Sequence, residues 1–353
     1  MPGAQCRLYV GGHAAPEGIF KVKHIWLITD GVTGHEVRSG AVCAALALSG
    51  DTTVTRILCT RMGALAKLIS RGEGRWPESV PMGLLSWSHG LTLPSGPCDV
   101  VVGAGRRTAG AVIALGRHMQ AKTVFCGLPI GFDPSRFDAI VVPTTGVSGD
   151  NVLRLDVPLS VAGFPAVEQR ILAPRGLADG ATGLVLVGGP AEGYDYTTQD
   201  WRNLADLLKS ISATGGHIEV LTSRRTQAEA VQILKGAQGD GVSVYAPTDP
   251  DTPKVSERLI AVDWALVTQD SATMLGEAVS CGLPTFSWAP EQSRPNARIA
   301  EVLARLTAAQ RLAPLVSTAQ PVAMEDLHAA LNRVQPMPQH PVRDVATFLQ
   351  ARL

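Results

Sequence analysis

Short apolar runs that end in glycine or polar loops alternate along the chain with amphipathic or alanine-rich segments. In the first half this pattern predicts strands over residues 25–29, 52–58, 99–103, 123–126 and 137–143, and helices over residues 39–48 and 108–119. In the second half it predicts strands over residues 184–187, 217–221, 242–245, 264–267 and 284–288, and helices over residues 199–213, 226–235 and 271–280. Unbroken apolar runs are typical of parallel strands that are buried on both faces. The pattern therefore predicts an α/β fold with two Rossmann-like, doubly wound parallel-sheet domains.

Weak periodicity over residues 151–180, where Pro158, Pro165 and Pro174 lie, marks the boundary between the two halves. The expected parts are an N-terminal extension over residues 1–22, an N-terminal domain over 23–165, a C-terminal domain over 166–330 and a helical tail over 331–353. Ligands of such sheets bind at the carboxyl ends of the strands. In proteins with two such domains, these ends face a common cleft.

Composition narrows the class of protein. The 353 residues include 31 Lys or Arg and 31 Asp or Glu, so there is no global basic field and nucleic acid is not an expected partner. The six cysteines form no CxxC pair and match no zinc-motif spacing, which favours a reduced cytoplasmic protein. No stretch reaches the about 18 consecutive apolar residues of a membrane span. We expect a soluble protein, with peripheral contact on the inner face of a membrane left open.

The loop after the first predicted strand carries the first candidate chemistry. Gly31 and Gly34 let the backbone turn sharply and approach a ligand closely, and the helix that follows offers free N–H groups to an anion. His35 and Glu36 can accept a proton there, and Asp30 opens the loop. We interpret this segment as catalytic and acceptor-binding. The alternative is a tight turn with a solvated histidine.

The loop after the strand at 99–103 contains Gly105, Arg106 and Arg107, followed by Thr108. It resembles half of a dinucleotide fingerprint, with threonine where the last glycine would stand. Two arginines at the start of a helix oppose the helix dipole unless an anion lies there. The loop therefore indicates either a bound phosphate or carboxylate, or an acidic partner inside the protein.

Two loops of the second half are typical of phosphate binding. Gly188 and Gly189 directly follow a strand and can pass close to a diphosphate. Ser223, Arg224 and Arg225 combine a hydroxyl with planar forks of donors at the start of a helix. Plain turns are the alternative interpretation of both loops.

A third segment of the second half fits the rest of a nucleotide. Asp270 and Ser271 precede a helix and can cap it, and Thr273 and Met274 lie in its first turn. Glu277 lies about two turns along, where a carboxylate can accept hydrogen bonds from both ribose hydroxyls. The alternative is a helix cap and a surface glutamate.

Taken together, these motifs resemble the ELM ("elongated mitochondria") fission-protein family. The resemblance covers roughly residues 24–290 and is carried, in order, by Trp26…Asp30-Gly31…Gly34-His35, Gly103-Ala104-Gly105-Arg106-Arg107-Thr108, Phe137-Asp138…Val142-Pro143, Gly188-Gly189-Pro190, Thr222-Ser223-Arg224-Arg225-Thr226 and Asp270-Ser271…Met274…Glu277-Ala278. The family includes plant mitochondrial proteins and bacterial relatives and looks like a relative of GT-B glycosyltransferases. The resemblance therefore implies the GT-B fold.

The resemblance also implies roles for single residues. The last motif is similar to the ribose-binding helix of the peptidoglycan N-acetylglucosaminyltransferase and of lipid A disaccharide synthase. By that likeness Glu277 would hold the ribose. Ser271 and Thr273 would lie near the diphosphate, Arg224 would offset its charge, and His35 would face the acceptor.

The chain departs from the family pattern at two places. The family usually has a glutamine where Arg38 or a neighbour stands, and commonly has His-Asp where this chain has Thr144-Thr145. The second departure leaves His35 and Glu36 as the more plausible bases.

Three functions remain after this comparison. The first is a glycosyltransferase that moves a sugar from a nucleotide-sugar co-substrate to a cell-envelope or lipid-linked glycan, with no other cofactor. The chain has no DxD-like acidic pair at a convincing site, so no essential metal is expected, and Arg224, Arg225 and the Gly188-Gly189 loop would stabilise the leaving diphosphate. The second is a non-enzymatic ELM-type adaptor that recruits a partner to a membrane. The third is a nucleotide-sugar epimerase, which shares the donor but needs no acceptor.

Overall fold

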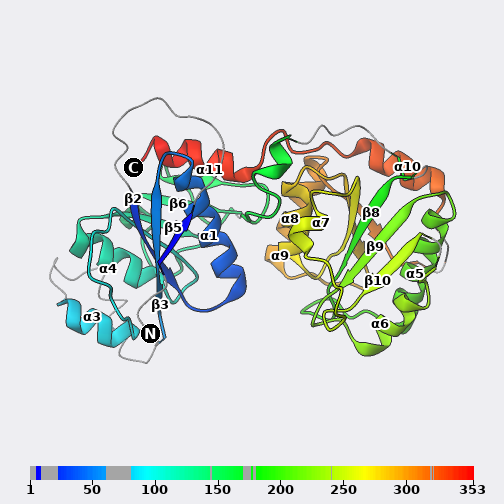
Figure 1. Ribbon diagram of the computed structural model, residues 1–353, viewed down its shortest axis with the longest axis horizontal. Coiled ribbons are helices and arrows are strands. Elements are labelled where there is room, and N and C mark those ends of the chain that lie inside the picture. Colours follow the sequence, from blue (N-terminus) through cyan, green and yellow to red (C-terminus); the bar gives the residue numbers. More distant parts are fainter. Residues whose placement is uncertain are drawn as a thin grey trace. The chain divides into compact units, whose positions relative to one another are not determined.

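Two sheets, one in each of two units, organise the chain in the computed structural model (Figure 1). The structure describes residues 5–8, 23–60, 81–143, 145–169, 176–177, 180–239, 241–318, 320 and 322–353. Unit 1 runs as far as Val161 and includes Pro341–Leu353, and unit 2 is Ala162–His340. The expected domain boundary between residues 165 and 166 differs from this division by a few residues.

Unit 1 contains a seven-stranded sheet with the strand order β1-β3-β2-β4-β5-β6-β7. Its strands are β1 Gln5–Leu8, β2 Lys23–Thr29, β3 Thr52–Leu58, β4 Val100–Ala104, β5 Lys122–Cys126, β6 Ala139–Val142 and β7 Val152–Arg154. Its helices are α1 Thr33–Ala47, α3 Met82–His89, α4 Ala109–Met119 and α11 Pro341–Gln350, with the 3-10 turn η1 Pro134–Arg136. All neighbouring strands are parallel except β1, which pairs antiparallel with β3. β1 lies within the expected N-terminal extension.

Unit 2 contains a six-stranded parallel sheet with the order β10-β9-β8-β11-β12-β13. Its strands are β8 Thr182–Val187, β9 His217–Thr222, β10 Val242–Tyr245, β11 Trp264–Thr268, β12 Thr285–Ala289 and β13 Ala313–Val316. Its helices are α5 Thr198–Ser212, α6 Ala228–Lys235, α7 Val255–Arg258, α8 Ala272–Ser280, α9 Ala297–Ala308 and α10 Met324–Arg333, with η2 Ala166–Gln169. Figure 1 shows α5 and α6 on one side of this sheet and α8 and α9 on the other.

Burial explains why the central strands form where the apolar runs lie. All five residues of β4 and all five of β11 are buried, as expected for parallel strands covered by helices on both faces. In unit 2 the large rings of Trp201, Trp264 and Phe286 fill the space between the sheet and its helices. These continuous cores hold the strand ends, and therefore the loops that follow them, in fixed positions.

Two parts of the secondary structure differ from the sequence prediction. α1 begins at Thr33 rather than at residue 39, because the Val32 carbonyl accepts bonds from the N–H groups of His35 and Glu36, and this polar first turn shows no apolar period. The tail over residues 331–353 is not one element. The end of α10 belongs to unit 2, whereas α11 belongs to unit 1 and contacts α1.

Some expectations fall on residues outside the described ranges. These are most of residues 1–22, Pro174 and Thr144. Among the helices that are described, none combines the length and the apolar character needed to cross a bilayer.

A buried histidine in each unit makes stability depend on pH. His89 at the end of α3 is fully buried and His340 is 2% exposed. Burial lowers the pKa of both imidazoles from the usual 6.5, because a charged ring would lose its hydration. His89 Nδ1 lies 2.9 Å from the Ser88 hydroxyl, and His340 Nε2 lies 3.1 Å from the Ala162 carbonyl oxygen.

We expect the free energy of unfolding to fall as the pH drops below 6.5, the usual histidine pKa. In that range the unfolded chain binds protons that the folded chain does not, so each histidine lowers stability by at most about 1.4 kcal/mol per pH unit. Chemical denaturation at a series of pH values measures the slope. The double variant His89→Asn, His340→Asn should flatten it, whereas His217→Asn, at an exposed position, should not. An unchanged slope in the double variant would contradict this origin.

Candidate functional site

The carboxyl end of β2 in unit 1 carries a histidine–aspartate pair. Asp30 follows β2, and His35 lies in the first turn of α1. The Nδ1 atom of His35 lies 3.0 Å from both carboxylate oxygens of Asp30. The side chain of Asp30 is 3% exposed and that of His35 is 26% exposed. The carboxylate favours the tautomer with its proton on Nδ1, which leaves Nε2 free to accept a proton.

The loop after β4 packs directly against this pair, because β4 is the neighbour of β2 in the sheet. Gly105 has a φ of +87°, and a Cβ atom at that position would lie 2.2 Å from Nδ1 of His35. Only glycine allows both the backbone conformation and this close approach. The loop therefore fixes the position of the imidazole ring from the side of β4.

Replacing Gly105 by alanine should lower the stability of unit 1 by about 1–3 kcal/mol, because it adds backbone strain and displaces the imidazole. Chemical denaturation gives the stability, and the NMR signals of His35 report the displacement. Gly34→Ala is the matched control, since a Cβ atom there meets nothing within 4 Å and alanine favours the helix. If Gly105→Ala were as stable as the wild type and left the His35 signals unchanged, the close contact between Gly105 and the His35 ring would not be required.

Of the other predicted site residues of unit 1, some form hydrogen bonds or ion pairs within the protein and others are exposed. Glu36 accepts a hydrogen bond from the Thr29 hydroxyl at 2.9 Å and pairs with Arg56. Arg106 and Arg107 are exposed and follow Gly105 in the loop that contacts His35. Gly31, with a φ of +77°, makes the turn from β2 into α1.

In unit 2 the corresponding loops follow three neighbouring strands, β9, β8 and β11. Their centre is Asp270, whose side chain has no exposed surface. Its carboxylate accepts hydrogen bonds from Nη2 of Arg225 at 2.7 Å, from the N–H of Gly189 at 3.2 Å and from the hydroxyl of Tyr196 at 3.3 Å. One buried carboxylate therefore joins all three loops. A ligand could not reach it without displacing these donors.

The two glycines after β8 are explained by close packing. A Cβ atom on Gly188 would lie 2.0 Å from Oδ2 of Asp270, and one on Gly189 would lie 2.2 Å from the backbone oxygen of Arg225. The hydroxyl of Ser223 donates to the Gly188 carbonyl at 3.1 Å. The Gly188-Gly189 loop and the 223–226 loop thus support each other at the edge of the sheet.

Several predicted nucleotide-binding residues remain accessible. Arg224 is exposed, and within the described part of the chain no ion pair engages it. Ser271 caps α8 by accepting a bond from the N–H of Met274 at 3.4 Å, and Thr273 is exposed in the first turn. Glu277 is half-buried in the second turn of α8.

Three polar residues that were not selected as site residues organise these loops, although Thr226 belongs to the 222–226 motif. Thr268 accepts a bond from the N–H of Gly188 at 2.7 Å, and Thr226 donates to the Val187 carbonyl at 3.1 Å. The hydroxyl of Tyr196 also lies 3.2 Å from the Trp288 carbonyl oxygen. Burial and the Asp270 carboxylate raise the pKa of Tyr196 above its usual 10, so its hydroxyl stays a donor. No local pattern marks Tyr196, because its partners lie far away in the sequence.

The described residues contain no cluster of His, Cys, Asp or Glu that could hold a metal ion. The polar groups at the two sheet edges are hydroxyls, guanidinium groups, backbone N–H groups and one imidazole, together with the carboxylates of Asp30, Glu36, Asp270 and Glu277. Such groups bind anions and move protons.

Comparison with known proteins identifies relatives of both sequence and fold. A model of the family described as mitochondrial fission ELM1 matches residues 33–336. The mitochondrial fission protein ELM1 of Arabidopsis thaliana is 27% identical over 103 residues, which are 29% of this chain and 24% of that protein. The chain thus matches about a quarter of the plant protein's length.

Solved structures share the architecture of nearly the whole chain. MurG of Acinetobacter baumannii has a TM-score of 0.52 at 13% identity, covering 93% of this chain and 99% of its own. UDP-GlcNAc 2-epimerase of Methanocaldococcus jannaschii has a TM-score of 0.52 at 11% identity, with the same coverage. MnaA of S. aureus, solved with UDP, has a TM-score of 0.51 at 11% identity, covering 92% and 94%. Likeness at these identities shows the fold, which is of the GT-B type.

Proposed function

This chain belongs to the mitochondrial fission ELM1 family, and we propose that it is a metal-independent GT-B-type glycosyltransferase that uses a UDP-sugar. Its acceptor would be a cell-envelope or lipid-linked glycan. The observation that carries this proposal is the Asp30–His35 pair, a proton acceptor held by a buried carboxylate. Sugar transfer to a hydroxyl group releases the proton of that group, and such a base can accept it.

Unit 2 supplies groups suited to the nucleotide. UDP is chosen because MnaA of S. aureus, which shares the fold, was solved with it. Arg224 and the free N–H groups at the start of α8 would stabilise the diphosphate, and Glu277 would accept hydrogen bonds from the ribose. Asp270 and Arg225, which bind each other, would position these loops.

The reaction then follows from ordinary acid–base chemistry. Nε2 of His35 takes the proton of the acceptor hydroxyl as its oxygen forms a bond to the anomeric carbon of the sugar. The bond from that carbon to the diphosphate oxygen breaks, and UDP leaves with the electron pair. Asp30 stabilises the resulting imidazolium. Glu36 is held by Arg56 and Thr29, so the base is assigned to His35 alone.

We expect UDP and one or more UDP-sugars to raise the melting temperature in a screen that also contains GDP, CDP, ADP and CMP. At a hundred times its Kd, a ligand of the native state stabilises it by about 2.7 kcal/mol. Glu277→Ala and Arg224→Ala should each weaken binding about 10- to 100-fold, as removal of a charged hydrogen-bonding partner does. Glu257→Ala and Arg202→Ala, at exposed positions elsewhere in unit 2, serve as controls.

The possible outcomes separate the alternatives. Binding that is unchanged in both test variants would remove the nucleotide assignment. If no nucleotide binds, an ELM-type adaptor that recruits a partner to a membrane becomes the better hypothesis. The fold shared with UDP-GlcNAc 2-epimerase favours an epimerase as the second enzymatic candidate. Product analysis distinguishes it, because an epimerase converts the free nucleotide sugar without an acceptor.

A further inference from the structure

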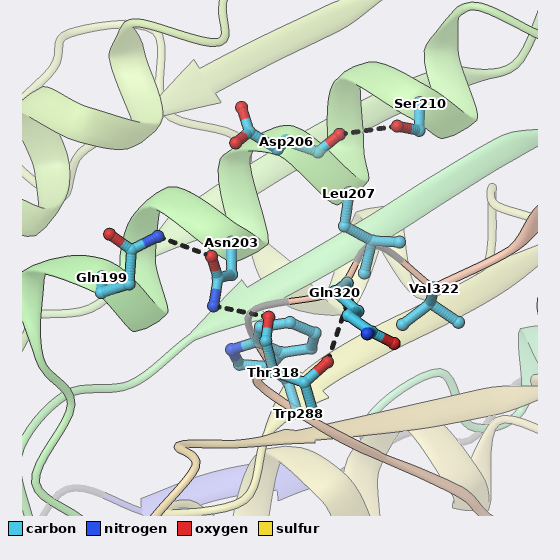
Figure 2. Close-up of a pocket in the computed structure, with 9 residues that line it drawn as sticks. All are labelled: Gln199, Asn203, Asp206, Leu207, Ser210, Trp288, Thr318, Gln320 and Val322. Atoms are coloured by element: carbon cyan, nitrogen blue, oxygen red, sulfur yellow. Dashed lines mark hydrogen bonds between the residues drawn. The ribbon is translucent and has the colours of Figure 1, made fainter.

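A cavity of about 220 Å³ lies in unit 2 between α5 and the segment that follows β13. Figure 2 shows the side chains of α5 along one wall, Thr318 and Gln320 opposite them, and Trp288 beneath. None of the lining residues belongs to the loops around Asp270. The cavity is therefore separate from the proposed nucleotide site.

The wall formed by α5 is a polar stripe. Gln199, Asn203, Asp206 and Ser210 recur at intervals of three or four residues and so lie on one face of the helix. The opposite face is buried in the core of unit 2. The amphipathic pattern of α5 thus places four hydrogen-bonding side chains against the cavity, with Leu207 as the apolar residue of this wall.

Hydrogen bonds within the protein hold this wall in place. Nδ2 of Asn203 donates to the Ser317 hydroxyl at 3.0 Å and to the Thr318 carbonyl at 2.9 Å, which ties α5 to the segment after β13. Nε2 of Gln199 donates to Oδ1 of Asn203 at 2.8 Å. The walls are therefore preformed, which lowers the entropy lost when a ligand binds.

The remaining polar groups define what would fit. The Asp206 carboxylate is 74% exposed and lies 3.8 Å from Nζ of Lys209, so it can accept further hydrogen bonds. The indole N–H of Trp288 is buried and has no hydrogen-bond partner among the described residues. Because that atom has almost no accessible surface, a ligand in the cavity would contact the ring of Trp288 rather than its N–H. No lining residue is basic, and Leu207 and Val322 add apolar surface.

We propose that this cavity binds one neutral, hydroxyl-rich ring of the size of a single sugar residue. A carboxylate without a lining cation disfavours phosphate and carboxylate ligands. Oxygen acceptors fit hydroxyl donors, and the apolar side chains fit the C–H face of a sugar. At about 220 Å³ the cavity is smaller than the roughly 300–1,000 Å³ of pockets for drug-sized ligands, which excludes a whole nucleotide sugar.

Saturation-transfer NMR on the full chain tests this site with glucose, galactose and N-acetylglucosamine, and with glucose 6-phosphate as the anionic comparison. We expect transfer to at least one neutral sugar and weaker transfer to the phosphate ester. Asp206→Ala should weaken binding about tenfold and Gln320→Ala about twofold or more, because each removes a hydrogen-bonding partner. A short oligosaccharide in the same assay distinguishes a free sugar from the end of a glycan.

Glu257→Ala is the matched control, since Glu257 is an exposed carboxylate paired with a lysine three residues away, as Asp206 is. It should leave sugar binding unchanged. The proposal would be overturned if no neutral sugar showed saturation transfer, or if the phosphate ester showed stronger transfer than the neutral sugars. It would also be overturned if both test variants bound the sugar as well as the wild type does. UDP binding is measured separately on Asp206→Ala, where we expect no change, so that failure of one site is distinguishable from failure of the other.

Discussion

Replacing His35 by glutamine should lower the turnover of the donor by about 10²- to 10⁴-fold, the usual contribution of a general base. Glutamine keeps hydrogen-bonding capacity but cannot take up a proton. Turnover is measured as release of nucleoside diphosphate from the sugar nucleotide that shifts the melting temperature. Donor affinity should stay unchanged, because the proposed donor loops belong to unit 2 and His35 to unit 1.

The partner of His35 provides a second test of the same role. Asp30→Asn keeps the shape of the side chain but removes the charge that fixes the tautomer and stabilises the imidazolium. We expect a loss of turnover with a changed pH profile, which a purely structural role would not produce. His217→Gln, at an exposed position, is the control. Turnover within a few-fold of the wild type in His35→Gln would exclude this histidine as the base.

Replacing Asp270 by alanine should lower the stability of unit 2 by about 2–4 kcal/mol. The change removes the acceptor of the buried N–H of Gly189, at about 1–3 kcal/mol for an unsatisfied group. It also removes one of the two acceptors of the Tyr196 hydroxyl, which keeps the Trp288 carbonyl. Removing one partner of a fully buried ion pair typically costs about 3–5 kcal/mol. We expect a smaller loss here because the Arg225 side chain is 45% exposed and water can solvate it. Chemical denaturation measures the difference.

Two further variants isolate the cause. Asp270→Asn keeps one oxygen acceptor, which the N–H of Gly189 can use, but loses the charge that pairs with Arg225. It should therefore be less destabilising than alanine. Asp206→Ala removes a carboxylate that is 74% exposed and should change stability by no more than about 0.5 kcal/mol. Wild-type stability in Asp270→Ala would show that the three loops do not depend on this carboxylate.

The apolar runs predicted the central strands of both sheets because buried parallel strands need apolar residues on both faces. The strand runs at 99–103 and 264–267 correspond closely to β4 and β11. The edge strands β7 and β13 were missed for the same reason, whereas the edge strand β10 was predicted over residues 242–245. Only three residues form β7, and β13 is partly exposed, so neither carries a continuous apolar run.

Sequence order also placed the candidate residues at strand ends, since every glycine-rich loop follows an apolar run. It could not determine which side chains meet. Asp30 and His35 were both selected, but their contact depends on the turn at Gly31, with its positive φ. Glu36, selected as a second base, lies instead against Arg56 from the neighbouring strand.

The sequence by itself determined the α/β class, the two-sheet organisation, the family and the loops that carry chemistry, because these depend on local periodicity and on motifs that are short in sequence. Only the tertiary structure decided that Asp270 is a buried partner of Arg225, 45 residues away, rather than an open contact for a ligand. It also decided that Asn203 closes a cavity with Thr318, 115 residues away. Such pairings arise from the order of strands in the sheet and from helix packing. A local pattern along the chain does not show which distant residues these bring together.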